Sequence, residues 1–576
     1  MLNAGDILRA KGLWYGASYV AAVVWCLFVP VACMTPDKAV EESDETGTRL
    51  ATDYWRMQTG STNDFNVHRP ADTLTLRIAL LAAARGEQNV IFPKIPNVTD
   101  VGTSNAVLCL SLTDALRVAA RNDRRYQKLK EDVFLRALEL DYQQYAFETS
   151  FSGMMLALLS GDPGIRKASE STEAGFTRRL PDGTDLVGRL ALDVVSLLRD
   201  DWRSVALSGD LTVTVPLMRG AGREIVREPL TQAERNLVSA IHAYQHYRQT
   251  YAVSVANGYF TVLQLEQQFK NALENERRLN ENSRRAEMWF EAGRMQRIQV
   301  DQARTDLLKA GESVIATRKN FNAQMDAFKM AIGLPPEGNV TLDSDQLYRL
   351  EMQKETMAQT NMSAINDFPD EKEACRIALA ERHDLYIVRS QLEDTARGVK
   401  IAADALRADV ALTGGLTMDR MRVTGDGSFD GEETLSGGLR AGFPWDRRKE
   451  RNAFKRQLIA LEQTKREVEA QEDNVKLTVR NGLRNLVAAR ASYKNQVEAM
   501  KVAKLRVESN NLFLQSGRSS MRDILEAESA LLSARNALCA AVIEWHMSDL
   551  ELRRDMGVLE ISETGVWRDA NGENHG

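Results

Sequence analysis

Hydrophobic residues recur at every seventh position in two stretches of the chain, one beginning at Val300 and the other at Ile524. The two series are Val300, Leu307, Val314, Phe321 and Phe328, and Ile524, Leu531, Leu538, Trp545 and Leu552. Small residues stand three positions after the first three large ones of each series: Ala303, Ala310 and Thr317, and Ala527, Ala534 and Ala541. Large side chains that alternate with small ones on a heptad predict a tightly packed coiled-coil seam.

The two stretches share their boundaries as well as their spacing. A glycine precedes each helix and another closes it, 40 residues later in both cases: Gly293 and Gly333, and Gly517 and Gly557. Self-similarity at a fixed offset is the signature of an internal duplication. We therefore predict a first repeat over 111–336, a linker over 337–368 and a second repeat over 369–559.

A long helical pattern leads into each of these glycines. In the first copy it runs from Pro229, a favourable residue for a first turn, to about Ala292, and in the second from Arg447 to Leu514 without a proline. At a rise of 1.5 Å per residue each helix spans roughly 100 Å. Helices of this length cannot fold back into one globule, so we expect them to pack beside other helices of similar length.

Before each long helix the hydrophobic period changes from helical to two. Alternating segments occupy 185–195, 205–216, 409–418 and 435–444, and the last strand of each copy ends at a proline, Pro216 or Pro444. Apolar residues on one face and polar or small ones on the other suit a strand between lipid and water, although a half-buried strand of a soluble protein alternates equally well. Gly220 and Gly222 then follow Pro216, and we interpret them as a strand-to-helix joint.

The first residues resemble an export signal. Arg9 and Lys11 precede an uncharged run over 13–32, and Cys33 follows it. A basic start, an apolar middle and a small residue before the boundary predict a signal peptide over 1–32, which makes Cys33 a candidate for lipidation. A plain cleaved signal or an uncleaved inner-membrane anchor fits the same run.

The chain ends and begins with segments outside the repeats. Residues 33–110 form an N-terminal extension, which starts with a charged stretch that resembles a solvated tether and continues with one amphipathic helix over 71–88. Residues 560–576 form a polar C-terminal tail, for which we expect no fixed structure.

No segment after residue 32 holds 18 consecutive uncharged apolar residues, so a membrane-spanning mature chain would have to cross as a β-barrel. Four strands per chain cannot close a barrel, because about eight are needed. Several chains must therefore share one barrel, and three would supply twelve strands. The predicted fold is mainly α with a small β part, in which long coiled-coil helices pack side by side and strands from several chains share one barrel.

The remaining chemistry argues against other classes of protein. The formal net charge is −6 with no strongly basic block, which gives no support to nucleic-acid binding. The five cysteines lack C-x-x-C pairing. His242 and His246 share a helix face, but no third ligand accompanies them. With no nucleophile–base or metal constellation, we expect neither an enzyme nor a cofactor.

Several segments, in order and duplicated, resemble the TolC family of outer-membrane efflux channels over about 110–559. They are "LSLTDALRVAARND", "VPLMRGAGRE", "FPWDRRKERN", "EACRIALAERHDL" and the two glycine-led helices that end in "AIGLPP" and "DMGVLE". The resemblance implies a homotrimer whose twelve-stranded β-barrel lies in outer-membrane lipid and whose long coiled-coil α-helical barrel continues through the periplasm. It also implies a passive export conduit, completed by a periplasmic adaptor and an inner-membrane pump of the RND or ABC type.

In that family the two glycine turns form the periplasmic tip, which corresponds here to Gly293 with Arg294 and Gly517 with Arg518. The resemblance implies a pore constriction at Asp523 and Glu526, where three copies would form acidic rings that favour cations. Acidic residues at a helix N-terminus also interact well with the helix dipole, and both interpretations stay open. Drug efflux and type I secretion fit the sequence equally. A coiled-coil envelope scaffold without a pore is the alternative function, which the paired amphipathic strands disfavour.

Overall fold

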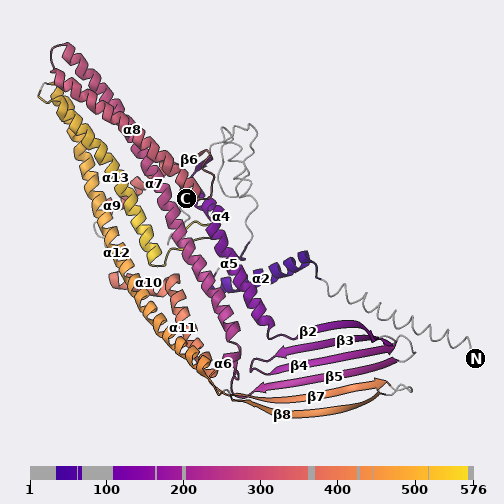
Figure 1. The fold of residues 1–576 in the computed structure, drawn as a ribbon. Helices are drawn as coiled ribbons and strands as arrows, with labels where there is room; N and C mark the ends of the chain where they lie inside the picture. Colours follow the sequence, from indigo (N-terminus) through magenta and orange to yellow (C-terminus); the bar gives the residue numbers. More distant parts are fainter. Residues whose placement is uncertain are drawn as a thin grey trace, which may run out of the picture.

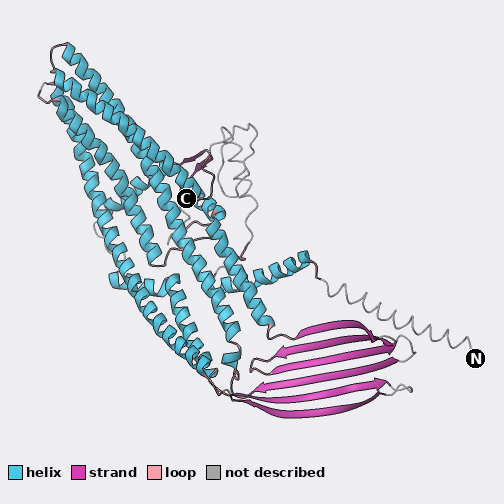
Figure 2. Cartoon of the chain, in the orientation of Figure 1, coloured by secondary structure: helices cyan, strands magenta, loops and turns pink. Residues whose placement is uncertain are grey.

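The protein consists of a long helical body with a β-sheet at one end (Figures 1 and 2). The computed structural model describes residues 34–60, 63–67, 108–162, 165–197, 203–360, 370–423, 429–443, 445–516, 518–562 and 564–567. The prediction of a mainly α chain with a smaller β part is confirmed. The signal segment with Cys33, the helix predicted over 71–88, Pro444 and Gly517 lie outside the described residues.

Two long helical hairpins form the body. The first joins α7 (Glu228–Glu291) to α8 (Arg297–Ala331), and the second joins α12 (Arg448–Gln515) to α13 (Met521–Asp555). The long arms contain 64 and 68 residues, and each begins and ends within one residue of its predicted boundary. The short arms contain 35 residues each, and α13 begins and ends 224 positions after α8.

The short arms also end in the same way, because both are closed by a left-handed glycine. Gly333 has φ of 78° and Gly557 has φ of 77°. Beyond them, the Leu334 N–H donates to the Lys329 carbonyl and the Val558 N–H to the Arg553 carbonyl, at 2.8 and 3.1 Å. This six-to-one bond is the Schellman closure, which satisfies carbonyls that the helix leaves free.

Shorter helices surround the hairpins and connect them to the sheet. These are α2 (Pro36–Thr59), α4 (Leu112–Asn122), α5 (Arg124–Tyr145), α6 (Arg223–Val226), α9 (Asp345–Thr360), α10 (Glu371–Glu381) and α11 (His383–Asp404). Next to the sheet, α5 packs on α7, α7 on α11, and α11 on α12, so these four helices form a row. The short strands β1 (Leu108–Leu110) and β6 (Val340–Leu342) pair in parallel near the middle of the body.

The sheet has six strands, so the prediction of four per chain is wrong. The strands are β2 (Ser150–Asp162), β3 (Ile165–Arg179), β4 (Asp185–Leu197), β5 (Arg203–Pro216), β7 (Asp409–Val423) and β8 (Phe429–Gly442). They pair antiparallel in the order β2-β3-β4-β5-β7-β8, which leaves β2 and β8 as edges. The four predicted strands correspond to β4, β5, β7 and β8, and β2 and β3 form an additional hairpin before them.

The additional hairpin was missed because neither strand alternates. In β2 the residues from Met154 to Leu159 are all apolar, whereas β3 is polar along most of its length. A continuous apolar run cannot be assigned to strand or helix by its period alone. The pairing of the two strands, from Ser150 with Thr177 to Asp162 with Ile165, makes up for their weak individual patterns.

The charged stretch after Cys33, which was expected to be a solvated tether, forms the largely exposed N-terminal half of helix α2. The C-terminal half of α2 is anchored by a buried stripe of Gly47, Ala51 and Trp55, and Gly47 lies directly against the ring of Phe134 on α5. Trp55 contacts Tyr244 of α7, with 5.7 Å between the ring centroids. Three anchoring residues at helical spacing therefore hold a segment that its charge alone would leave in solvent.

The beginning of the predicted loose tail is packed as well. Trp567 is buried with Val566 in the largest hydrophobic core of the body, and Ile561 forms a β-bridge with Trp567. The Arg248 guanidinium donates to the carbonyls of Ile561 and Ser562 at 2.7 and 2.6 Å. Val566 and Trp567, within the described residues 564–567, therefore pack on the helical body.

Among the residues described, no helix combines the length and the apolar character needed to cross a membrane.

Candidate functional site

The two faces of the sheet differ sharply in chemistry. Residues paired across neighbouring strands share a face, so each register line can be followed across the sheet. One line across all six strands is almost entirely apolar: Phe151, Phe176, Gly188, Leu211, Leu416 and Leu435. The next line, on the opposite face, is polar: Ser152, Gly175, Arg189, Asp210, Thr417 and Thr434. Such a division of residues is typical of a sheet that lies between an apolar medium and water.

Strand β2 departs from this division. Met154, Leu156 and Leu158 pair with Glu173, Ser171 and Ser169, which puts the three apolar residues on the polar face. Their side chains are largely exposed. Since β2 is an edge strand, this strip lies where the sheet of a single chain ends.

The strand-to-helix joint is fixed by its backbone. Pro216 ends β5, and Gly220 and Gly222 follow with φ of 75° and 105°, in the left-handed region that glycine adopts without strain. The Gly220 N–H donates to a carboxylate oxygen of Asp404 at 2.8 Å, and Asp404 is buried at the end of α11. The end of α11 is thereby tied to the segment that follows β5, where the helices enter the sheet.

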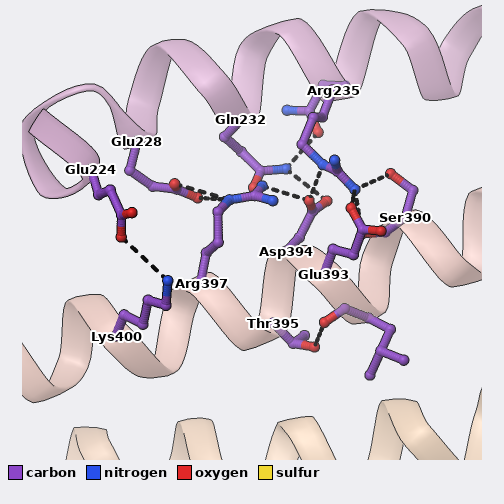
Figure 3. A network of polar contacts seen from close by, with 12 residues as sticks. Glu224, Glu228, Gln232, Arg235, Ser390, Glu393, Asp394, Thr395, Arg397 and Lys400 are labelled. Atoms are coloured by element: carbon purple, nitrogen blue, oxygen red, sulfur yellow. Dashed lines mark hydrogen bonds and ion pairs between the residues drawn. The ribbon is translucent and has the colours of Figure 1, made fainter.

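A network of ion pairs connects α7 to α11 just above this joint (Figure 3). Arg235 contacts Asp394 at 2.5 Å, and Arg397 contacts the same carboxylate at 2.7 Å. Arg397 also reaches Glu228 at 3.0 Å. Figure 3 shows that α7 and α11 contribute the network side by side, with the Lys400–Glu224 pair at its end, at 3.2 Å.

A second polar contact joins the two hairpins closer to their tips. Glu528, buried on α13, lies 3.3 Å from Arg278 on α7, and Arg535 lies 2.6 Å from Glu274. Burial raises the pKa of Glu528, and the neighbouring Arg278 acts in the opposite direction. The heptad pattern does not predict this contact, because it joins residues about 250 positions apart. The one local signal is an acid directly after the small seam residue Ala527.

The two hairpin tips are turned by matching hydrogen bonds. The Arg294 N–H donates to the Trp289 carbonyl and the Arg518 N–H to the Phe513 carbonyl, at 2.8 Å in both turns. Gly293 has φ of 71° in the first turn. The turns differ in how the next helix begins, because Gln296 precedes α8 without a side-chain cap, whereas Ser520 caps α13.

Asp523 completes that cap. The Ser520 side chain accepts from the Asp523 N–H at 3.3 Å, and the Asp523 carboxylate accepts from the Ser520 N–H at 2.8 Å. This reciprocal arrangement is a capping box. Hydrogen bonds from the Ser520 side chain and backbone lower the pKa of the exposed Asp523 carboxylate. Asp523 therefore has a local structural role, and its carboxylate stays charged at the tip.

Glu526 lies one turn further along α13, where it forms an exposed ion pair with Arg506 of α12 at 3.1 Å. The structure therefore brings both predicted constriction residues to the same tip, together with Arg518 of the turn. The first tip has Gln299 at the position that corresponds to Asp523, so the two tips of one chain differ in charge.

The histidines gain a partner that the sequence did not indicate. His242 Nδ1 lies 3.0 Å from His383 Nδ1 at the start of α11. The His242 ring also contacts the ring of Tyr386, with 3.9 Å between the centroids and a tilt of 33°. Burial and the neighbouring His383 lower the pKa of His242 to about 4. Within the described ranges no group of His, Cys, Asp and Glu has the geometry to hold a metal ion.

Known proteins share this arrangement of hairpins and strands. The model of the family described as "Outer membrane efflux protein" matches residues 200–333 and 375–558, more than half of the chain. The chain belongs to the outer membrane efflux protein family. The match covers β5, both hairpins and the second pair of strands, and membership in this family assigns the protein to the outer membrane. No curated protein matches the chain.

Solved structures share the fold at low sequence identity. The MtrE outer membrane channel of Neisseria gonorrhoeae in its open state is 13% identical, with a TM-score of 0.55, over 80% of this chain and 94% of that one. VceC of Vibrio cholerae is 15% identical, with a TM-score of 0.52, over 77% and 96%. CusC is 14% identical, with a TM-score of 0.54, over 81% and 97%. At these identities the likenesses show a shared fold, over 77% to 81% of this chain.

Proposed function

We propose that three copies of this outer membrane efflux protein close into a ring and form a passive channel across the outer membrane and the periplasm. The observation that carries the proposal is the two-faced sheet with its free edges. An unpaired strand edge is not tolerated in lipid, and the sheet of one chain presents two such edges, β2 and β8.

The direction of the edge strands supports closure by copies of the same chain. Strand β2 leaves the helical body at Ser150, whereas β8 returns to it at Gly442. The β8 strand of one copy would therefore run antiparallel to the β2 strand of the next, as the other pairs of the sheet do. Three copies of six strands would give eighteen strands instead of the expected twelve, in a barrel about one and a half times as wide.

In this arrangement the polar face, with Arg189 and Asp210, lines water, and the apolar face contacts outer-membrane lipid. The short arms of the two hairpins match over 35 residues at an offset of 224, as expected of an internal duplication. Three chains would therefore supply six similar hairpins and form a helical barrel with nearly six-fold symmetry. We further propose lipidation of Cys33, and assembly of the tips with a periplasmic adaptor and an inner-membrane RND or ABC pump.

Asp523 and Glu526 form the pore constriction in this proposal. Three copies would bring six carboxylates to the second tips, in a place where the lowered pKa of Asp523 keeps its charge. Rings of carboxylates in a narrow passage favour cations. The capping role of Asp523 does not compete with this function, because the cap uses one carboxylate oxygen, Oδ2.

The test is ion selectivity in a planar lipid bilayer. We expect discrete current steps with a cation preference from the wild type, and a weaker preference from the variant that combines Asp523→Ala with Glu526→Ala. Asp53→Ala is the matched control, because Asp53 is an exposed acid on α2, outside both hairpins. Equal ion selectivity of the wild type, the double variant and the control would refute the constriction at Asp523 and Glu526. An absence of current steps from membrane-inserted trimers would favour the alternative function, a coiled-coil envelope scaffold without a pore.

A further inference from the structure

Helix α2 continues well beyond the part that anchors it. Its buried stripe of Gly47, Ala51 and Trp55 covers only the C-terminal half. The N-terminal three turns are largely exposed, and in Figure 1 they project past α5, on the side away from α7, α11 and α12. A helical segment of three turns that is exposed on all sides gains little stability by itself. We therefore expect another surface to cover the projecting part of α2.

The projecting part carries a defined face. Continuing the buried stripe toward the N-terminus at helical spacing leads to Asp44, Val40 and Asp37, with Glu41 beside them. Val40 is 59% exposed. In the described part of the chain none of the three acids forms an ion pair, in contrast to Glu42, which lies 3.9 Å from Lys38. The unpartnered face is therefore acidic, with one exposed apolar residue at its centre.

The opposite edge of the same chain offers the complementary surface, at the start of α12. One side of α12 faces α11, because Gln457 lies against Gly398 and Gln471 donates to Asp384, both on α11. Arg448 and Lys455 lie on the other side of the helix, with Arg451 beside them. All three are exposed, and none of their side chains forms an ion pair within the described ranges.

The row of helices determines which surface meets which in a ring. Because α5 and α12 are the two ends of the row α5-α7-α11-α12, the α12 of one copy must lie beside the α5 of the next when β8 pairs with β2. The free side of α5 exposes Leu135, Glu139 and Tyr142, and that of α12 exposes Ile459. Both free sides thus carry exposed apolar residues, as a buried interface requires.

The heights above the sheet also agree. Gly47 of α2 touches Leu138 of α5, which lies seven residues before the end of that helix at Tyr145. Lys455 lies seven residues after the start of α12 at Arg448. At 1.5 Å per residue both points are roughly 10 Å from the sheet end of their helices. The acidic arm therefore projects at the level of the basic residues.

We propose that α2 is a clasp between subunits: its acidic N-terminal half docks on the basic start of α12 in the next copy of the chain. The inference rests on the proposed ring of three copies and adds the contact that holds neighbouring copies together outside the sheet. Each clasp crosses one subunit boundary, so a closed ring contains three.

Charge reversal with rescue tests the clasp in the full-length protein. One variant carries Asp37→Lys, Glu41→Lys and Asp44→Lys, and the second carries Arg448→Glu, Arg451→Glu and Lys455→Glu. The third combines both sets. Asp53→Lys is the control, since Asp53 is exposed on the opposite face of the same helix. Native mass spectrometry in detergent gives the fraction of trimer at several protein concentrations.

We expect each triple reversal to raise the dissociation constant per interface about tenfold, the effect of losing three exposed ion pairs. The combined variant should recover the trimer, because the pairs are restored with reversed sign, and Asp53→Lys should match the wild type. A loss of trimer that the combined variant does not recover would overturn the clasp.

The remaining outcomes separate the clasp from the ring. If the wild type is a trimer and the α2 reversal leaves it intact, the clasp is wrong while the proposed function stands. If only the α12 reversal acts, the basic residues bind something else, such as anionic lipid headgroups, and the clasp is again overturned. A wild type that is monomeric at every concentration would refute both proposals.

Discussion

The network between α7 and α11 should control how firmly these two helices are held together above the sheet. Asp394 accepts from Arg235, Arg397 and Gln232. The side chain of Asp394 is 19% exposed and that of Arg235 is 25% exposed. We predict that Asp394→Ala loosens α11 from α7, while the hairpins themselves stay folded.

The magnitude follows from burial and from the contacts that remain. Removing one partner of a buried ion pair costs about 3–5 kcal/mol. Here Arg235 keeps Glu393 and Arg397 keeps Glu228, and the site is partly exposed, so we expect about 2 kcal/mol. Amide hydrogen exchange in α11 reports this local opening, and about 2 kcal/mol corresponds to roughly 30-fold faster exchange.

Lys400→Ala is the matched control on the same helix. Its ion pair with Glu224 is largely exposed, at 66% and 81%, and such pairs contribute about 0–1 kcal/mol. Exchange in α11 should therefore change little in this variant. If Asp394→Ala and Lys400→Ala gave the same exchange rates, the network would not hold α7 and α11 together and the reasoning would be refuted.

Further predictions concern the turns, the histidines and the N-terminus. Gly557→Ala should lower the free energy of unfolding, measured with denaturant, by about 2–3 kcal/mol, since a Cβ there would lie 3.0 Å from the Glu381 backbone. Gly293→Ala should lower it by only about 1–2 kcal/mol, because a Cβ at Gly293 meets open space and only the positive φ is unfavourable. The pKa of His242 is lowered to about 4 in the folded protein. The stability that the neutral imidazole contributes should therefore be fully present above pH 6.5 and decline as the pH falls toward 4. A thermal unfolding temperature that stays constant across this range, or that falls as steeply in His242→Gln as in the wild type, would contradict this. Cys33→Ala should abolish metabolic labelling with fatty acid, and labelling that persists would exclude lipidation at this residue.

Much of the helical body could be predicted from the sequence, because the physical signals there are local and repeated. The seam from Val300 to Phe328 fixes one face of α8 every seventh residue, and its counterpart from Ile524 to Leu552 does so for α13. The absence of proline between Arg447 and Leu514 allows one uninterrupted helix. Each of these signals lies within a single element and requires no knowledge of its neighbours.

The features that were missed depend on partners far away in the sequence. Strands β2 and β3 form through each other, although neither has the alternation of a strand between lipid and water. Helix α2 is fixed by Phe134 and Tyr244, which its own charged sequence does not reveal. The pair of His242 with His383 and the pair of Arg235 with Asp394 join residues 141 and 159 positions apart. Such contacts arise from the tertiary fold, and no local pattern specifies them.

The candidate site shows the same division. The strand-to-helix joint at Pro216, Gly220 and Gly222 could be predicted from the sequence. The hydrophobic period changes there, and the two glycines permit backbone angles that other residues rarely adopt. The role of Asp404 in holding Gly220 could not be predicted, because 184 residues separate the two. Asp523 was expected either to interact with the dipole of a helix N-terminus or to line a pore. Its capping box places it at such an N-terminus and leaves its charge at the tip.

The central claim is that copies of this chain join their β2 and β8 edges into one closed ring around a continuous passage. Cryo-electron microscopy of the detergent-solubilised, full-length protein tests it most directly. The account predicts a threefold ring with eighteen strands, antiparallel pairing of β8 with the neighbouring β2, and α2 lying across each subunit boundary. A monomer with both strand edges free, or an assembly of the helices with no passage between them, would contradict it.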